Sequence, residues 1–171
     1  MSQKKVIILG IDPGTRITGY GVIETDLRTY TPLDYGCIRP PTTLSLHERY
    51  GLIHEGIEHL LETYPIEAVS LETQFVGRNV QSALKLGMAK GVAIVAATKR
   101  KIPIFEYAPK KAKLAVTGTG TASKEQVQRM TQTLLNLAEP PKPEDAADAL
   151  ALAICHANSI KQVPYEPIRK L

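Results

Sequence analysis

The most constraining stretch of the chain is residues 140–157, PPKPEDAADALALAICHA, which is typical of a buried helix that carries acids. Proline is tolerated in the first turn of a helix, so the pattern predicts a helix entered at Pro143. Asp145 and Asp148 are three residues apart and therefore share one face of that helix. A carboxylate near a helix N-terminus is stabilised by the helix dipole, which would explain Asp145 alone.

Asp148 needs a second explanation, because its neighbours are the alanines and leucine of a typical protein core. Burying a carboxylate without a partner is costly. Small alanine side chains leave room near the backbone, and a divalent cation held by oxygen ligands would neutralise both acids. Helix capping and metal binding are therefore the two interpretations of this segment.

The basic residues are concentrated in the middle of the chain. Ten basic residues and a single acid, Glu106, lie from Arg78 to Lys124, although the net charge of the whole chain is only +4. This asymmetry predicts a face that binds a polyanion such as nucleic acid, with a merely solvated surface as the alternative. Cys37 and Cys155 fit no zinc or redox spacing, so both are predicted to be buried apolar residues.

The N-terminus is basic and then apolar, but its apolar run is too short for a signal peptide or a membrane span. We therefore expect a cytoplasmic protein without a membrane partner. The length of 171 residues suits one domain, expected over 1–160, followed by a loose, proline-containing tail over 161–171.

Two further acids stand at the ends of predicted strands. The apolar residues 6–9 predict a buried strand that runs into a Gly-Ile-Asp-Pro-Gly turn, which contains Asp12. Residues 67–72 predict another strand, which ends at Glu72. If the two strands are parallel, both acids reach the same edge of the sheet. Taken alone, Asp12 is equally well explained as a turn-forming residue.

The remaining pattern predicts strands over 18–24, 33–39 and 103–107. It also predicts helices over 45–64 and 80–99 and a short helix that begins at Pro109. A further helix is predicted to begin at a capping box formed by Ser123 and Gln126. The buried face of that last helix is predicted to be Val127, Met130, Leu134 and Leu137. Helix 80–99 has small residues at Ala83, Gly87 and Gly91, which permit close approach of another backbone, within the subunit or across a dimer.

This order of elements predicts an α/β protein of ribonuclease H-like architecture. The mixed five-stranded sheet would have three antiparallel strands followed by parallel ones, with helices on both faces. Four converging carboxylates cannot all stay ionised without positive charge among them. Two Mg²⁺ ions about 4 Å apart would neutralise the acids and clamp a phosphodiester for hydrolysis.

Several short segments carry a resemblance to a known family: ILGIDPGTR at 8–16, TGYGVI at 18–23, SALKLG at 82–87, GVA at 91–93, FEYA at 105–108 and DAADALA at 145–151. Together they resemble the RuvC family of Holliday-junction resolvases, over about Val6 to His156. One departure from the family pattern is Thr73-Gln74, which leaves the sequence preference of cleavage open, and the tail beyond Lys161 has no clear counterpart in the family.

The resemblance implies roles for particular residues. Asp12, Glu72, Asp145 and Asp148 match the catalytic, metal-binding acids, with two Mg²⁺ per subunit expected and Mn²⁺ as a possible substitute. Phe75 matches an aromatic residue that stacks on an unpaired base, although the sequence alone fits a loop anchor equally well. The expected DNA-contacting residues are Phe75, Arg78, Lys113 and Lys124.

The resemblance also implies a reaction and partners. The family acts as a homodimer that nicks two opposed strands of a four-way DNA junction symmetrically, beside the RuvA and RuvB branch-migration proteins. Three other functions are alternatives: an acetate/sugar-kinase-like ATPase, a catalytically silent DNA-binding module and a ribonuclease for RNA–DNA hybrids. The ATPase would need two such domains, the binding module does not explain four acids, and the ribonuclease shares fold and metal chemistry.

Overall fold

The computed structural model describes residues 5–73, 77 and 79–161. Its strands are β1 (Val6–Asp12), β2 (Thr18–Thr25), β3 (Tyr30–Ile38), β4 (Ala68–Glu72) and β5 (Ile104–Tyr107). Its helices are α1 (Leu46–Thr63), α2 (Val80–Lys99), α3 (Pro109–Thr117), α4 (Lys124–Leu134) and α5 (Glu144–Lys161). The predicted order of strands and helices is confirmed, and α5 begins one residue after Pro143 and reaches Lys161, the first residue of the expected tail.

The five strands form one mixed sheet in the order β3-β2-β1-β4-β5. Strands β1, β2 and β3 are an antiparallel meander, whereas β4 lies parallel to β1 and β5 parallel to β4. Ile11 pairs with Leu71, so the residues that follow them, Asp12 and Glu72, end their strands at the same edge. The predicted ribonuclease H-like architecture is confirmed.

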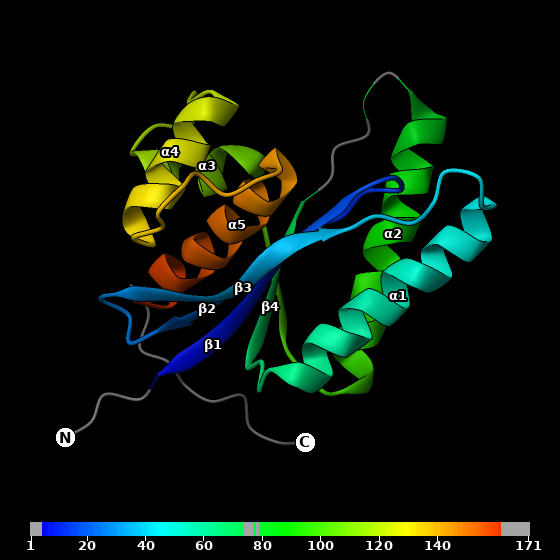
Figure 1. The fold of residues 1–171 in the computed structure, drawn as a ribbon, viewed down its shortest axis with the longest axis horizontal. Helices are drawn as coiled ribbons and strands as arrows, with labels where there is room; N and C mark the ends of the chain where they lie inside the picture. Colours follow the sequence, from blue (N-terminus) through cyan, green and yellow to red (C-terminus); the bar gives the residue numbers. More distant parts are fainter. Residues whose placement is uncertain (1–4, 74–76, 78, 162–171) are drawn as a thin grey trace.

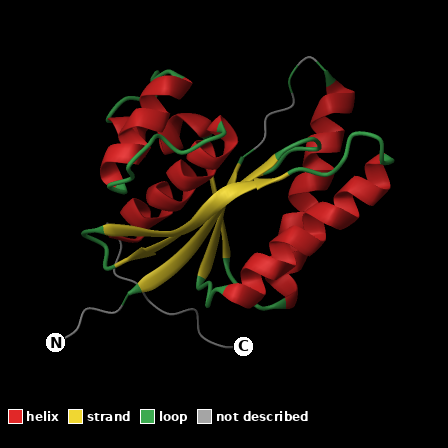
Figure 2. Cartoon of the chain, in the orientation of Figure 1, coloured by secondary structure: helices red, strands yellow, loops and turns green. Residues whose placement is uncertain are grey.

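Helices cover both faces of this sheet, as Figures 1 and 2 show: α1 and α2 on one side, α3, α4 and α5 on the other. Successive residues of each strand point to opposite faces of the sheet and pack into the hydrophobic core on each side. Leu9 and Ile11 pack with the buried residues of α1 and α2, whereas Ile8 packs with those of α5. Helix α5 is the most enclosed helix, with every residue from Ala149 to Ala157 buried.

Three details differ from the sequence-based expectations. Met130 is exposed, and the neighbouring Thr131 is buried in its place, because α4 is rotated relative to the predicted face. Leu134, the last residue of α4, and Leu137, which lies beyond the helix, are only partly buried. Cys37 is partly exposed on the edge strand β3, while Cys155 is buried as predicted.

Helix α2 exposes much of its apolar surface. Val80, Leu84, Met88 and Val95 are each more than half exposed, and their spacing places them on one stripe. Among the helices of the described residues, only α2 is long and apolar enough, by length and composition, to cross a membrane. An ion pair nevertheless joins α2 to the sheet, because Lys90 Nζ lies 2.6 Å from Glu106 Oε2 of β5.

Candidate functional site

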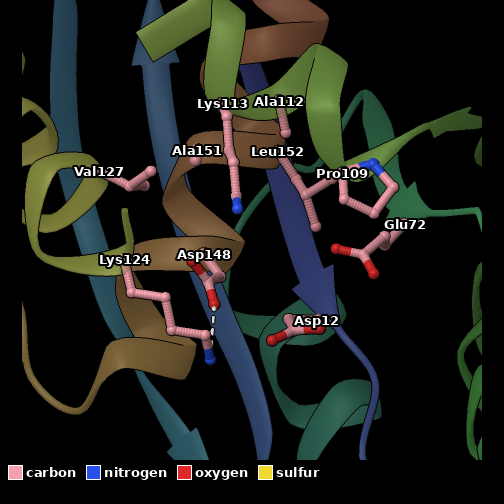
Figure 3. Close-up of a pocket in the computed structure, with 10 residues that line it drawn as sticks. All are labelled: Asp12, Glu72, Pro109, Ala112, Lys113, Lys124, Val127, Asp148, Ala151 and Leu152. Atoms are coloured by element: carbon pink, nitrogen blue, oxygen red, sulfur yellow. Dashed lines mark ion pairs between the residues drawn. The ribbon is translucent and has the colours of Figure 1, made fainter. Parts of the chain in front are cut away.

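Three of the four acids surround one pocket of about 290 Å³. Asp12 comes from the end of β1, Glu72 from the end of β4 and Asp148 from α5, and Figure 3 shows their carboxylates turned toward a common space. The other lining residues are Pro109, Ala112 and Lys113 of α3, Lys124 and Val127 of α4, and Ala151 and Leu152 of α5. The pocket therefore has an acidic rim, two lysines and an apolar wall.

The alternation of the strands explains why the acids face α5. Successive side chains of a strand point to opposite faces, so Ile8, Gly10 and Asp12 share one face of β1. In β4 the same face carries Ser70 and Glu72, and the Ser70 hydroxyl donates a hydrogen bond to the Leu152 carbonyl of α5 at 2.8 Å. Both strand-end acids therefore lie on the side of the sheet that α5 covers.

Glycines allow α5 to lie directly on the sheet. A Cβ atom on Gly10 would lie 1.9 Å from the Ala149 carbonyl oxygen, and one on Gly19 would lie 2.1 Å from the Asp145 carbonyl oxygen. Gly19 is also the register partner of Asp12 in β2. The absence of a side chain at Gly19 thus brings the N-terminal turn of α5 close to the end of β1.

We expect Gly19→Ala to lower DNA cleavage by about 10²-fold, because a displacement of about 1 Å in a catalytic group has that effect. The new methyl group would push the Asp145 turn away from Asp12, and overpacking should also lower the free energy of unfolding by about 1–3 kcal/mol. The measurement is single-turnover cleavage beside urea unfolding. Gly51→Ala is the matched control, since a Cβ there meets no atom within 4 Å. Equal cleavage by the two variants would contradict this account.

Burial of the acids, together with repulsion among them, dominates the electrostatics of the pocket. Burial, followed by the charges of Glu72, Asp148 and Asp145, raises the pKa of Asp12 to about 7. The pKa values of Glu72 and Asp148 are also raised, chiefly by burial, although nearby lysines oppose the shift. Such acids gain from a bound cation, because it restores the ionised form of each carboxylate.

Two lysines already provide part of that positive charge. Lys124 Nζ lies 3.9 Å from Asp148 Oδ2 and 3.6 Å from Glu144 Oε2. Lys113 projects from α3 toward the acids in Figure 3. Sequence reasoning singled out both lysines but not Glu144, although its position directly before Asp145 was a signal for a further acid at this helix end.

The carboxylates fit a hard divalent cation such as Mg²⁺ or Mn²⁺ better than a metal that prefers thiolate or imidazole ligands. Asp145 does not line the pocket, although its charge contributes to the raised pKa of Asp12. Within the described part of the chain, no three histidine, cysteine or acidic side chains are close enough to enclose a metal ion by themselves. An open set of carboxylate oxygens suits Mg²⁺, which commonly takes one or two carboxylates and completes its shell with water and substrate phosphate.

The four predicted DNA-contacting residues divide into two groups. Lys113 and Lys124 line the pocket, beside the acids. Phe75 and Arg78 lie outside the described residues, so their predicted contacts with DNA stay predictions. The adjoining Thr73 is described, and its backbone N–H donates to the Tyr107 carbonyl at 2.9 Å.

A ribonuclease H-like sheet with acids at the ends of β1 and β4 and on α5 defines a class of protein, the metal-dependent nucleases that hydrolyse phosphodiesters. The family model for RuvC, described as crossover junction endodeoxyribonuclease RuvC, matches residues 8–156. The chain therefore belongs to the RuvC family of endodeoxyribonucleases. Nucleases of this family depend on a divalent metal ion.

Individual relatives agree with this assignment. The chain is 63% identical over 166 residues to a crossover junction endodeoxyribonuclease RuvC of Protochlamydia amoebophila, covering 96% of this chain and 99% of the relative. The same enzyme of Chlorobaculum parvum is 51% identical over 150 residues, covering 88% of this chain and 80% of the relative. A solved structure of Thermus thermophilus RuvC in complex with a Holliday junction substrate matches with a TM-score of 0.87 and 34% identity, covering 95% of this chain and 99% of that one.

Proposed function

We propose that this protein resolves four-way DNA junctions in recombination and repair, by paired symmetric nicks that hydrolyse phosphodiester bonds. The observation that carries the proposal is the meeting of Asp12, Glu72 and Asp148 at one pocket beside Lys113 and Lys124. The likeness to a RuvC structure solved with a Holliday junction supports the branched substrate.

Asp12, Glu72, Asp145 and Asp148 are the proposed metal ligands and catalytic acids, for two Mg²⁺ per subunit with Mn²⁺ as a substitute. When bound, these ions would activate the attacking water and stabilise the leaving oxygen. The protein's own contribution is to orient the carboxylates from three separate elements around one phosphate. Because no side chain must form a covalent intermediate, the acids act by position and charge.

The lysines and the apolar wall bind and orient the DNA. Lys113 and Lys124 would pair with the phosphates beside the cut, and that pairing makes binding weaken as salt rises. Lys124 is 62% exposed at its side chain, so it is free to move from Asp148 to a phosphate. Phe75 is proposed to stack on an unpaired base near the junction crossover, and Arg78 is proposed to contact the DNA.

A homodimer is the proposed working form, because two opposed nicks require two active sites. The exposed apolar stripe of α2 supports this helix as the contact surface. A Cβ on Gly87 or Gly91 would meet no atom within 4 Å, so packing among the described residues of the subunit does not explain these two glycines. The RuvA and RuvB branch-migration proteins are the proposed partners, and the DNA substrate supports a cytoplasmic location.

We expect Leu84→Asp to convert the dimer to a monomer, since it places a charge in the centre of the apolar stripe. Leu84 is 64% exposed in the subunit, so the substitution should leave the free energy of unfolding of the monomer nearly unchanged. Light scattering after gel filtration gives the mass. Leu114→Asp is the control, because Leu114 is 53% exposed on α3 instead. A dimeric Leu84→Asp variant would exclude this surface.

The function itself is tested with a labelled synthetic four-way junction, beside linear duplex and an RNA–DNA hybrid, with and without Mg²⁺. Paired nicks in the junction alone, and only with metal, are the expected result. Cleavage of the hybrid but not the junction would identify a ribonuclease instead. Tight junction binding without cleavage under Mg²⁺ or Mn²⁺ would leave a DNA-binding module.

A further inference from the structure

We propose that a buried pair outside the pocket, Tyr107 of β5 and His156 of α5, is a positioning device that sets the placement of Glu72 relative to Asp148. The proposal rests on the proposed function, because it takes Glu72 and Asp148 as metal ligands. Neither Tyr107 nor His156 lines the pocket, so they would act through the acids and not on the substrate.

The pair is buried and joined directly. The Tyr107 hydroxyl lies 2.7 Å from His156 Nδ1, and the two residues are 7% and 2% exposed. The Phe105 ring stacks on the His156 ring, with centroids 4.2 Å apart. Lys111 Nζ lies 4.9 Å from the centre of the Tyr107 ring and covers it from the α3 side. A polar contact enclosed in this way has one defined geometry.

On the strand side, Tyr107 connects the pair to Glu72. Tyr107 is the register partner of Glu72 in the parallel ladder between β4 and β5. The Tyr107 carbonyl also accepts the backbone N–H of Thr73, at 2.9 Å, directly after Glu72. The position of Tyr107 therefore sets the position of the end of β4, and with it the position of the Glu72 carboxylate.

On the helix side, His156 connects the pair to Asp148. Asp148, Leu152 and His156 are spaced by four residues and so share one face of α5. Leu152 lies between the other two, lines the pocket and packs in the same small cluster as Tyr107. The hydrogen bond between Tyr107 and His156 thus joins the acid-bearing face of α5 to the acid-bearing edge of the sheet.

The effect of the pair on the site is geometric and not electrostatic. Burial lowers the pKa of His156 to about 4, so its ring is neutral near pH 7. Removing the Tyr107 hydroxyl therefore changes no charge near the acids. The hydrogen bond between Ser70 and Leu152 remains in such a variant, so α5 stays attached to β4 while its fine placement is lost.

A matched control exists on the other side of the same helix. The Tyr30 hydroxyl of β3 hydrogen-bonds to Asn158 Oδ1 of α5, two residues after His156. Tyr30→Phe and Tyr107→Phe each remove one hydroxyl that joins a sheet-edge strand to α5. Only Tyr107 is paired with a strand that carries a proposed metal ligand.

The test measures metal binding separately from cleavage. Thermal stability is followed as Mg²⁺ is added to the full chain, junction affinity is measured without metal, and single-turnover cleavage is measured across Mg²⁺ concentrations. Tyr107→Phe is expected to raise the Mg²⁺ midpoint in both the stability and the cleavage titrations about tenfold, as loss of outer contacts to metal ligands does. Junction affinity and the Tyr30→Phe midpoint should stay within about twofold of the wild type.

A second pair of variants separates positioning from packing. His156→Asn keeps a polar atom near the position of Nδ1, whereas His156→Leu keeps only the volume of the side chain. The Asn variant should therefore bind Mg²⁺ more tightly than the Leu variant. Equal midpoints for Tyr107→Phe and Tyr30→Phe, in a wild type that cleaves junctions with Mg²⁺, would overturn the positioning proposal alone. A wild type that neither responds to Mg²⁺ nor cleaves a junction would overturn the proposed function itself.

Discussion

Asp148→Asn is expected to lower junction cleavage by about 10³-fold, the size of effect seen when a group that stabilises transition-state charge is lost. The substitution keeps the shape of the side chain but removes a carboxylate charge from the lining of the pocket. Junction affinity should stay the same or rise slightly, because binding depends on contacts between basic residues and phosphates. The measurements are single-turnover cleavage with Mg²⁺ and a gel-shift titration without it.

Glu144→Gln is the matched control for this variant. Glu144 also pairs with Lys124, at 3.6 Å, but it is more than half exposed and does not line the pocket. We expect its cleavage rate to stay within about threefold of the wild type. If Asp148→Asn instead lost folding and junction binding together, Asp148 would be a structural residue and the metal site would be misplaced.

Asp12→Asn is expected to stabilise the metal-free protein, and the gain should grow with pH. The pKa of Asp12 is raised from 3.8 to about 7, so the folded state holds the proton more tightly than the unfolded state does. The free energy of unfolding therefore falls as pH rises from about 4 to 7, and the full cost is present above pH 7. That cost is about 4 kcal/mol, at 1.36 kcal/mol for each pKa unit.

Urea unfolding in EDTA at pH 5 and pH 8 measures this gain. Asp12→Asn should exceed the wild type by up to about 4 kcal/mol at pH 8 and by less than half of that at pH 5. Asp26→Asn is the control of opposite sign, because hydrogen bonds from Thr29 and Arg28 lower the pKa of Asp26 to about 2. Parallel pH profiles for Asp12→Asn and the wild type would show that the pKa of Asp12 is not raised in the folded protein.

Mg²⁺ extends the same experiment. A cation at the acids should raise the stability of the wild type at pH 8, because it offsets the burial and the repulsion that together raise the pKa of Asp12. Asp12→Asn should gain much less from Mg²⁺, since it has lost both the repulsion and one proposed ligand. Equal Mg²⁺ responses would place the ion elsewhere on the protein.

Local chemistry was enough to predict the elements and the acids. A turn of proline and glycine after an apolar run located Asp12 at a strand end, and helical spacing put Asp145 and Asp148 on one face. The capping box at Ser123 is observed as predicted, with Ser123 accepting from the Gln126 backbone N–H. These features depend on residues a few positions apart, so the sequence alone determines them.

Only the tertiary structure decided which residues of distant elements come into contact. The lack of side chains on Gly10 and Gly19 matters only because α5 lies on them, more than 120 residues later in the chain. The contact of Tyr107 with His156, the exposure of Met130 and the position of Asp145 beside the pocket, not in its lining, likewise follow from sheet register and helix rotation. Those depend on the packing of the whole core, in which many long-range contacts are optimised together and no local pattern specifies any one of them.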